Sequence, residues 1–161
     1  MGSVRHEIKQ QRPFQSAGQE AVVALLRTAA LVRRRFEELC DERGLTFQQF
    51  NVLRILRGAE SRGEGALPTM EVAERMIEPE PGITRMMARL EKKQMVRRIR
   101  DAEDSRRVLC HITKEGLDAL QRLDDPVSRL DDAVLGPLAE KELKVLTDLL
   151  DRVREPMHAP A

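Results

Sequence analysis

Apolar residues recur every three or four positions through most of this chain, the spacing that places them on one face of an α-helix. Polar stretches that contain Gly or Pro separate the apolar runs. Thr46, Thr69 and Thr113 stand where runs begin and are predicted N-caps. The pattern predicts a mainly α-helical protein. We expect the helices at residues 19–43, 46–58, 70–76, 81–94, from 114 onward and at 140–154.

The segments between these helices are expected to be irregular. Residues 1–18 are polar and predict a loose N-terminal arm, while residues 59–67 carry two glycines and predict a flexible connection. Asp125 and Pro126 lie inside the run that begins at residue 114. Because proline removes a helical hydrogen bond, we expect it to interrupt or kink this helix, with Asp125 capping the second half.

The helices at residues 70–76 and 81–94 have the order of a helix-turn-helix motif, a short helix, a break and a second helix. In the second helix the apolar residues share one face, and Arg85, Arg89 and Lys92 fall on another. Burying these charges would be costly. They are therefore expected at the surface, where they contact phosphates or bases or are simply solvated.

Two strands are predicted directly after this motif, at residues 95–100 and 107–112, where apolar and polar side chains alternate in the second strand. A hairpin in this position is a wing, the small β-hairpin of a winged helix-turn-helix domain. Its tip can reach a groove beside the one that the preceding helix enters. We expect Asp104 to brace the loop by pairing with a neighbouring Arg, and Arg106 to read DNA rather than to be a solvated loop charge.

The composition agrees with one helical domain. Of 161 residues, 41% are hydrophobic and only 2% aromatic, so Leu, Val, Ile, Ala and Met must form the core. The 34% of charged residues suits helices with solvated outer faces. No apolar run reaches the ~18 residues that cross a bilayer, and the N-terminus lacks a secretory apolar segment. Both features predict a cytoplasmic protein.

The net charge is only +1, but the charges are unevenly distributed. Residues 85–107 hold nine basic and four acidic side chains, whereas residues 117–161 hold six basic and ten acidic ones. A polyanion such as DNA would be tolerated at the basic end of the molecule. A solvated surface of mixed sign is the alternative explanation of the same numbers.

Residues that carry catalytic or metal chemistry are few and scattered. His6, His111 and His158 have no ligand or base spacing, and the chain contains no nucleophile elbow, zinc motif or phosphate-binding loop. We therefore expect no enzyme activity, no metal and no cofactor. Cys40 and Cys110 fall on apolar stripes, which favours inert packing over the alternative of oxidant sensing.

Several motifs, taken in order, resemble the MarR family of bacterial winged helix-turn-helix regulators. The wing carries the most specific match: Asp104-Ser105-Arg106, a short apolar strand, Ile112-Thr113 and Gly116 are similar to the family's D-x-R, strand, Leu/Ile-Thr and Gly. The resemblance covers residues 19–154. The other matching residues are Leu45, Thr46, Gln49, Val52 and Leu53, then Glu71, Ala73, Glu74 and Arg75, then Thr84, Arg85, Arg89, Leu90 and Glu91.

The resemblance implies a single MarR-like domain over residues 1–161, with the winged helix-turn-helix at 46–116 and dimerisation helices at 19–45 and 117–155. It implies a homodimeric regulator, commonly a repressor, that binds pseudo-palindromic double-stranded DNA and is released by a small aromatic or phenolic anion. In such a protein the recognition helix enters the major groove and Arg106 the minor groove. A thiol-sensing regulator of the same fold and a helical protein-binding adaptor are the alternatives. The expected DNA contacts are Thr84, Arg85, Arg89, Lys92, Arg106 and Arg107.

The segment Glu80-Pro81-Gly82 departs from the family, in which Ser or Thr often begins the recognition helix. Without those hydroxyls, base reading must depend on Thr84, Arg85 and the helix N-terminus. A ligand is expected against the helix at residues 46–58, where aromatic walls and cations lie close in sequence. Core packing explains the aromatic residues equally well. The candidate lining residues are Arg33, Phe36, Phe50, Asn51 and Arg54.

Overall fold

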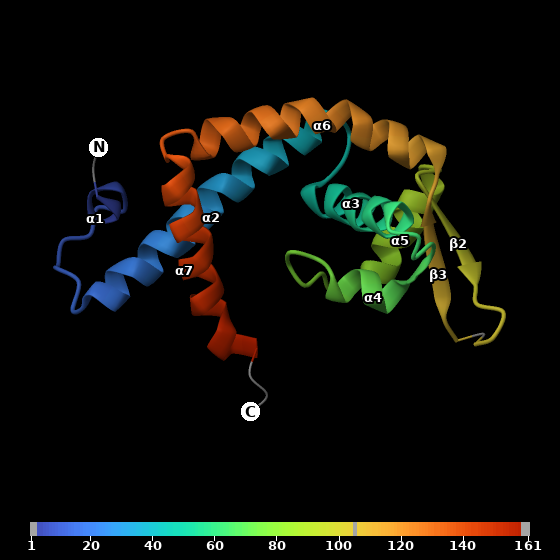
Figure 1. The fold of residues 1–161 in the computed structure, drawn as a ribbon, viewed down its shortest axis with the longest axis horizontal. Coiled ribbons are helices and arrows are strands. Elements are labelled where there is room, and N and C mark those ends of the chain that lie inside the picture. Colours follow the sequence, from blue (N-terminus) through green and yellow to red (C-terminus); the bar gives the residue numbers. More distant parts are fainter. Residues whose placement is uncertain (1–2, 105, 159–161) are drawn as a thin grey trace.

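Figure 1 shows a computed structural model of the protein, which describes residues 3–104 and 106–158. The elements are α1 (Val4–Glu7), α2 (Ala17–Asp41), α3 (Phe47–Ser61), β1 (Leu67–Pro68), α4 (Thr69–Glu74), α5 (Ile83–Lys92), β2 (Val96–Arg100), β3 (Val108–Ile112), α6 (Lys114–Leu135) and α7 (Glu140–His158).

The molecule has two parts, joined by the long helix α6 (Figure 1). The winged lobe contains α3, α4, α5, the three strands and the first half of α6. The helical extension contains α1, α2, the second half of α6 and α7. The predicted class, mainly α with a small β wing, is confirmed.

Side-chain caps fix where the main helices begin. Thr46 Oγ1 accepts a hydrogen bond from Gln49 N, and Gln49 Oε1 accepts one from Thr46 N, which together form a capping box at the start of α3. Thr113 Oγ1 accepts a hydrogen bond from Gly116 N at the start of α6. Both predicted caps are confirmed. Ser16 caps α2 in the same way, through Gln19 N.

The sheet is antiparallel with strand order β1-β3-β2. The register of the wing pairs Val96 with Ile112 and Arg100 with Val108. On its other side, β3 pairs with the two residues of β1, with Leu67 opposite Cys110. This pairing attaches the middle of β3 to the residues that directly precede α4, and so joins the wing to the helix-turn-helix motif.

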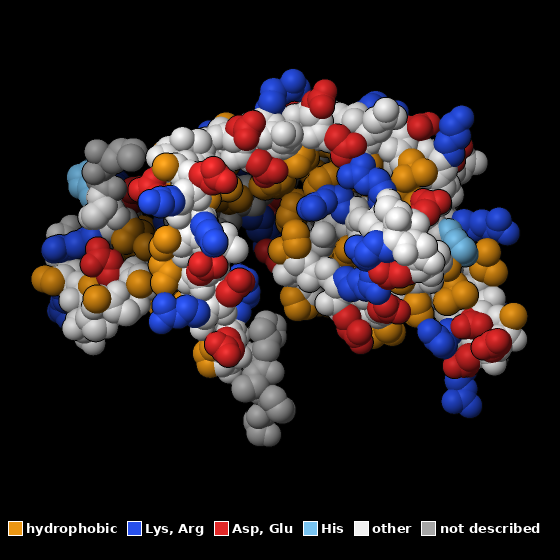
Figure 2. Space-filling model, in the orientation of Figure 1, with side chains coloured by type: hydrophobic (Ala, Val, Ile, Leu, Met, Phe, Trp, Pro, Cys, Tyr) orange, Lys and Arg blue, Asp and Glu red, His pale blue; other side chains and the backbone are white. Residues whose placement is uncertain are grey.

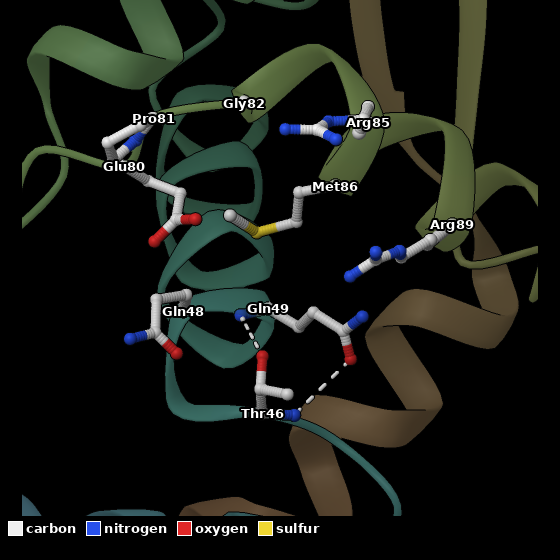
Figure 3. Close-up of a pocket in the computed structure, with 9 residues that line it drawn as sticks. All are labelled: Thr46, Gln48, Gln49, Glu80, Pro81, Gly82, Arg85, Met86 and Arg89. Atoms are coloured by element: carbon white, nitrogen blue, oxygen red, sulfur yellow. Dashed lines mark hydrogen bonds between the residues drawn. The ribbon is translucent and has the colours of Figure 1, made fainter.

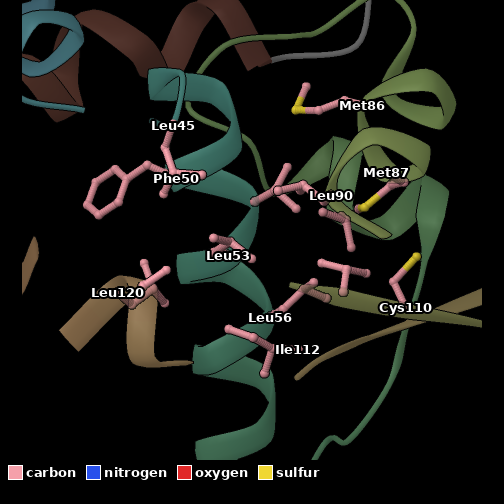
Figure 4. Packing of buried hydrophobic residues seen from close by; sticks show 14 of the residues in the cluster. Leu45, Phe50, Leu53, Leu56, Met86, Met87, Leu90, Cys110, Ile112 and Leu120 are labelled. Carbon is pink, nitrogen blue, oxygen red and sulfur yellow. The ribbon is translucent and has the colours of Figure 1, made fainter. Parts of the chain in front are cut away.

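The core of the winged lobe surrounds α3 (Figure 4). This helix packs against β3 and the first half of α6. Its Leu53 and Leu56 are no more than 1% exposed, and Met87 and Leu90 of α5 are fully buried in the same cluster. Burial of α5 by its apolar face leaves its opposite face directed away from the lobe.

The helical extension buries much less apolar surface. α2 and α6 pack together, yet Leu26 on α2 is 65% exposed and Val145 on α7 is 57% exposed. None of the described helices combines the length and apolar composition needed to cross a membrane. The other exposed large apolar residues of α2, α6 and α7 are Val22, Leu25, Leu31, Leu135, Leu146, Leu149, Val153 and Met157.

The predicted end of one helix and the predicted interruption of another are wrong. α3 continues through Gly58 to Ser61, because one glycine inside a packed helix costs only ~1 kcal/mol. α6 continues without interruption through Pro126 to Leu135. Its packing against α2 and α3 holds the turns on both sides of the proline in helical conformation.

The predicted cap of α4 is also wrong. Pro68 precedes this helix, and Thr69 lies inside it without capping it. The Thr69 hydroxyl instead donates to the carbonyl oxygen of Val108, at 3.1 Å. The short elements α1 and β1 form in segments that are predicted to be irregular. They are stabilised by contacts with α2 and β3, respectively, so the local sequence alone does not indicate them.

Candidate nucleic-acid interface

The recognition helix α5 has one buried face and one polar face. Met87 and Leu90 anchor the buried face. The side chains of Thr84, Arg85, Arg89 and Lys92, four of the predicted DNA contacts, are all exposed. None of the three basic residues among them forms an ion pair with another described residue.

Gly82 begins the recognition helix in a left-handed conformation with φ +97°. Residues with a side chain rarely adopt this conformation. The missing side chain also makes room for Arg85, because a Cβ placed at Gly82 would lie 3.3 Å from Arg85 Nη2. The sequence feature that departs from the family thus determines where the Arg85 guanidinium lies, folded back over the start of α5.

The turn that leads into α5 is held from two other helices. The buried side chain of Asn51 on α3 accepts a hydrogen bond from Ile77 N, with an Oδ1–N distance of 2.9 Å. Arg33 on α2 pairs with Glu78, with Nη1 3.0 Å from Oε2, and also with Glu37 on its own helix. The orientation of the recognition helix is therefore linked to the helical extension.

The wing is attached to the recognition helix by a pair of charged side chains. Glu91 on α5 accepts hydrogen bonds from Arg98 on β2, one from Nε at 2.8 Å and one from the backbone N at 3.2 Å. The guanidinium hydrogen bond lowers the pKa of Glu91 below its usual value. In the sequence, Arg98 is only one of nine basic residues between positions 85 and 107, because its spacing from Glu91 matches no regular helix or strand pairing.

Backbone hydrogen bonds shape the wing tip. Asp104 Oδ1 accepts from Arg106 N at 3.0 Å, and the Asp104 carbonyl oxygen accepts from Arg107 N at 2.9 Å. The ion pair at the tip joins Asp101 to Arg107, at 3.8 Å. Asp104 thus contacts the backbone rather than an Arg side chain, and the Arg106 side chain is exposed. The middle residue of the predicted D-x-R motif, Ser105, lies outside the described residues.

A groove of about 420 Å³ lies between the wing and the starts of α4 and α5. It brings Thr84 of α5 together with Arg106 and Arg107 of the wing. Arg85 and Arg89 line a second cavity on the other flank of α5. Figure 2 shows basic side chains at the wing tip beside acidic ones. The predicted DNA contacts therefore occupy both flanks of one helix and the hairpin next to it.

The five residues predicted to line a ligand pocket all contact other residues of the protein. Phe50 is 2% exposed and belongs to the core. The Phe36 ring packs on Phe47, with 5.7 Å between centroids, and the Arg54 guanidinium lies over the Phe50 ring at 5.6 Å. The other two, Arg33 and Asn51, hold the turn before α5 as described above.

Both cysteines are buried. Burial raises the pKa of Cys40 to about 11, and it raises the pKa of Cys110 above its usual value. The reactive form of a cysteine is the thiolate. These environments therefore oppose oxidant sensing by either thiol.

Comparison with known proteins identifies the family. A family model described as transcriptional regulator SarA/Rot matches residues 34–123, more than half of the chain. The structure of a MarR transcription factor from Planctomyces limnophilus is 35% identical, and the match covers 86% of this chain and 98% of that one, with a TM-score of 0.65. The chain belongs to the MarR family.

Two further relatives extend the comparison. The HTH-type transcriptional regulator FarR of Neisseria gonorrhoeae is 28% identical over 138 residues, which are 86% of this chain and 91% of FarR. The structure of NadR in complex with 4-hydroxyphenylacetate is 26% identical, with a TM-score of 0.67 and coverage of 88% of this chain and 97% of NadR. This MarR protein is thus a DNA-binding transcriptional regulator and not an enzyme.

Proposed function

We propose that this MarR protein is a homodimeric, ligand-responsive repressor of a pseudo-palindromic operator, with α5 in the major groove and the wing in the adjacent minor groove. The observation that carries the proposal is the surface shared by Thr84, Arg106 and Arg107 where α5 meets the wing. A narrow minor groove concentrates negative potential, which suits an inserted guanidinium such as that of Arg106. Arg85, Arg89 and Lys92 are assigned to phosphates or base edges along the major groove.

The proposed dimerisation surface lies on residues 19–45 and 117–155, most of which belong to the helical extension. Its exposed apolar side chains, such as Leu26 and Val145, need a partner, and a second copy of this chain supplies a matching apolar surface. The dimer would present two α5 helices to half-sites roughly one duplex turn apart, ~10 base pairs. Light scattering tests this step, and Leu149→Glu on α7 should shift the mass from dimer to monomer.

Release by a small aromatic or phenolic anion is proposed to act through Arg33. NadR, a relative, was solved with 4-hydroxyphenylacetate, a phenolic acid. In this chain an acidic ligand near Phe36 and Arg54 would compete with Glu78 for the Arg33 guanidinium. Loss of the Arg33–Glu78 pair would free the turn before α5, which changes the separation of the two recognition helices.

The experiment is fluorescence anisotropy of the duplex upstream of the protein's own gene, titrated across salt concentrations, with a random duplex alongside. Wild type should bind its own sequence more tightly than the random one, with affinity that falls steeply as salt rises. Arg106→Ala should weaken specific binding by more than twofold, whereas Lys114→Ala, an equal charge change at the exposed first residue of α6, should not. No binding to either duplex at low salt would favour a protein-binding adaptor instead.

A further inference from the structure

Two adjacent lysines stand at the end of the recognition helix, and their side chains have different surroundings. Lys92 is the last residue of α5 and Lys93 is its C-cap, and both residues are exposed. The Lys93 ammonium group donates a hydrogen bond to the carbonyl oxygen of Gly44, with 2.6 Å between Nζ and the oxygen. The side chain of Lys92 forms no hydrogen bond or ion pair with another described residue. Two neighbours of the same residue type thus differ in what they contact.

The carbonyl group that Lys93 contacts belongs to a closed turn between α2 and α3. Gly44 N donates to Asp41 O at 3.0 Å, and Leu45 N donates to Cys40 O at 3.2 Å. Leu45 is only 2% exposed and Cys40 is fully buried, so this turn is packed onto the core. The C-terminus of a helix carries partial negative charge, which favours an ammonium group there. Lys93 therefore attaches the end of α5 to a fixed point at the end of α2.

A second acceptor contacts the same ammonium group. Gln49 Oε1 lies 3.4 Å from Lys93 Nζ and also accepts a hydrogen bond from Thr46 N, at the start of α3 (Figure 3). Gln49 is buried, so its oxygen has little freedom to move. To bind a DNA phosphate, Lys93 would have to leave both acceptors. These contacts favour a role within the protein over a role at the DNA.

The opposite end of the recognition helix is attached to α2 as well. The Arg33–Glu78 pair holds the turn before α5, and the Lys93–Gly44 hydrogen bond holds the end of α5. One attachment fixes the position of one end of a helix, whereas two attachments fix the direction of its axis. The axis of α5 is thus fixed relative to α2, which carries part of the proposed dimerisation surface.

We propose that Lys93 is a positioning residue, which fixes the angle between α5 and α2 and thereby the spacing of the half-sites that the dimer binds. Lys92 keeps the DNA contact that the proposed function assigns to it. The inference rests on that function, in which the two α5 helices of a dimer enter successive turns of the major groove. Each base pair of spacer rotates one half-site by about 34–36° relative to the other, so a change in the direction of α5 changes the spacing that fits best.

The test compares Lys93→Met with wild type. Methionine retains an apolar stem and removes the ammonium group. Anisotropy is measured with the duplex upstream of the protein's own gene and with two derivatives, in which the spacer between the half-sites is one base pair longer or shorter. Wild type should bind the native spacing about tenfold more tightly than either derivative, the equivalent of about one mismatched base pair. In Lys93→Met this preference should fall to about threefold, with an unchanged dependence on salt, because a hydrogen bond within the protein is lost and no phosphate contact.

Lys92→Met is the matched control, since it removes an equal charge one residue away. It should weaken binding to all three duplexes by the same factor and reduce the salt slope by about one. Its spacing preference should equal that of wild type. A wild-type spacing preference in Lys93→Met, or a salt slope reduced as in Lys92→Met, would overturn the positioning role and would assign Lys93 to a phosphate.

Amide hydrogen exchange tests the attachment without DNA. The backbone N–H groups of residues 93–95 donate to carbonyl groups in the last turn of α5. Their protection factors should fall by about threefold in Lys93→Met and stay unchanged in Lys92→Met, while Leu53 in α3 keeps its protection in both. Unchanged protection of residues 93–95 in Lys93→Met, or an equal loss at Leu53, would contradict the inference. Because this measurement needs no operator, failure of the attachment and failure of the proposed DNA binding give different results.

Discussion

Arg33 in the helical extension and Glu78 in the turn before the recognition helix form an ion pair with Nη1 3.0 Å from Oε2. The two residues are 45 positions apart in sequence. Their contact is a direct physical connection between the proposed dimerisation surface and the helix that carries the DNA contacts. Both side chains are about 40% exposed, so the pair contributes to geometry more than to stability.

A double-mutant cycle of Arg33→Ala and Glu78→Ala measures this connection. In urea unfolding, the coupling free energy should lie in the range of exposed pairs, about 0.2–1 kcal/mol. If the pair orients the recognition helix, both single variants and the double variant should show the same loss of operator affinity. Independent, additive losses would mean that the two residues act separately.

Replacement of Asn51 by Ala should destabilise the protein, because the Ile77 N–H then loses its only acceptor among the described residues. Because this hydrogen bond is only partly buried and Ile77 itself is 62% exposed, its loss should cost about 0.5–1.5 kcal/mol in the free energy of unfolding. Urea denaturation measures the cost, with Gln121→Ala, an exposed amide on α6, as the control. Equal stability of the two variants would show that the hydrogen bond does not hold the turn.

Gly116 should tolerate no side chain. A Cβ there would lie 2.3 Å from the carbonyl oxygen of Met95 and 2.8 Å from Ile112 Cγ1. Gly116→Ala should therefore lower the free energy of unfolding by about 1–3 kcal/mol through overpacking. At Gly18 on α2 the nearest atom is Ser16 Oγ at 3.7 Å, so Gly18→Ala should stabilise by about 0.5–1 kcal/mol. A thermal unfolding scan that ranked the two variants the other way would contradict this packing.

Stability should fall in alkali partly because of Cys40. Its pKa is about 11 in the folded protein against 9.0 for the unperturbed group. Because the folded state retains the proton more strongly, its contribution is complete below about pH 9 and is lost as the pH rises towards about 11. Unfolding free energies of wild type and Cys40→Ala should therefore converge between pH 9 and pH 11. Parallel curves over that range would show that the thiol does not titrate differently in the two states.

The parts of the fold that depend on local sequence could be predicted. Thr46 with Gln49 is a capping box that can be recognised from four consecutive residues, and α3 begins there. The hairpin register follows from the alternation of apolar residues that ends at Ile112. The polar face of α5 follows from the spacing of Arg85 and Arg89. Each of these features is decided by neighbours within a few positions.

The parts that depend on distant contacts could not be predicted. Asn51 is predicted from the sequence to line a ligand pocket, and nothing in the sequence indicates that its oxygen accepts a hydrogen bond from a backbone N–H 26 residues away. The sequence predicts that Pro126 interrupts or kinks α6, whereas packing on α2 and α3 keeps this helix continuous. The two-residue strand β1 exists only because β3 lies beside it. The cavity beside α5 likewise combines residues of α3 and α5 that no sequence spacing relates.

Hydroxyl-radical footprinting of the operator tests the central claim most directly, because it reports minor-groove contacts nucleotide by nucleotide. The dimer should protect two symmetric minor-groove segments that flank two unprotected major-groove half-sites about one turn apart, ~10 base pairs. Arg106→Ala should remove the flanking protection while binding persists at higher protein concentration. A single protected segment, or a footprint that Arg106→Ala leaves unchanged, would contradict the account of a winged dimer reading its operator.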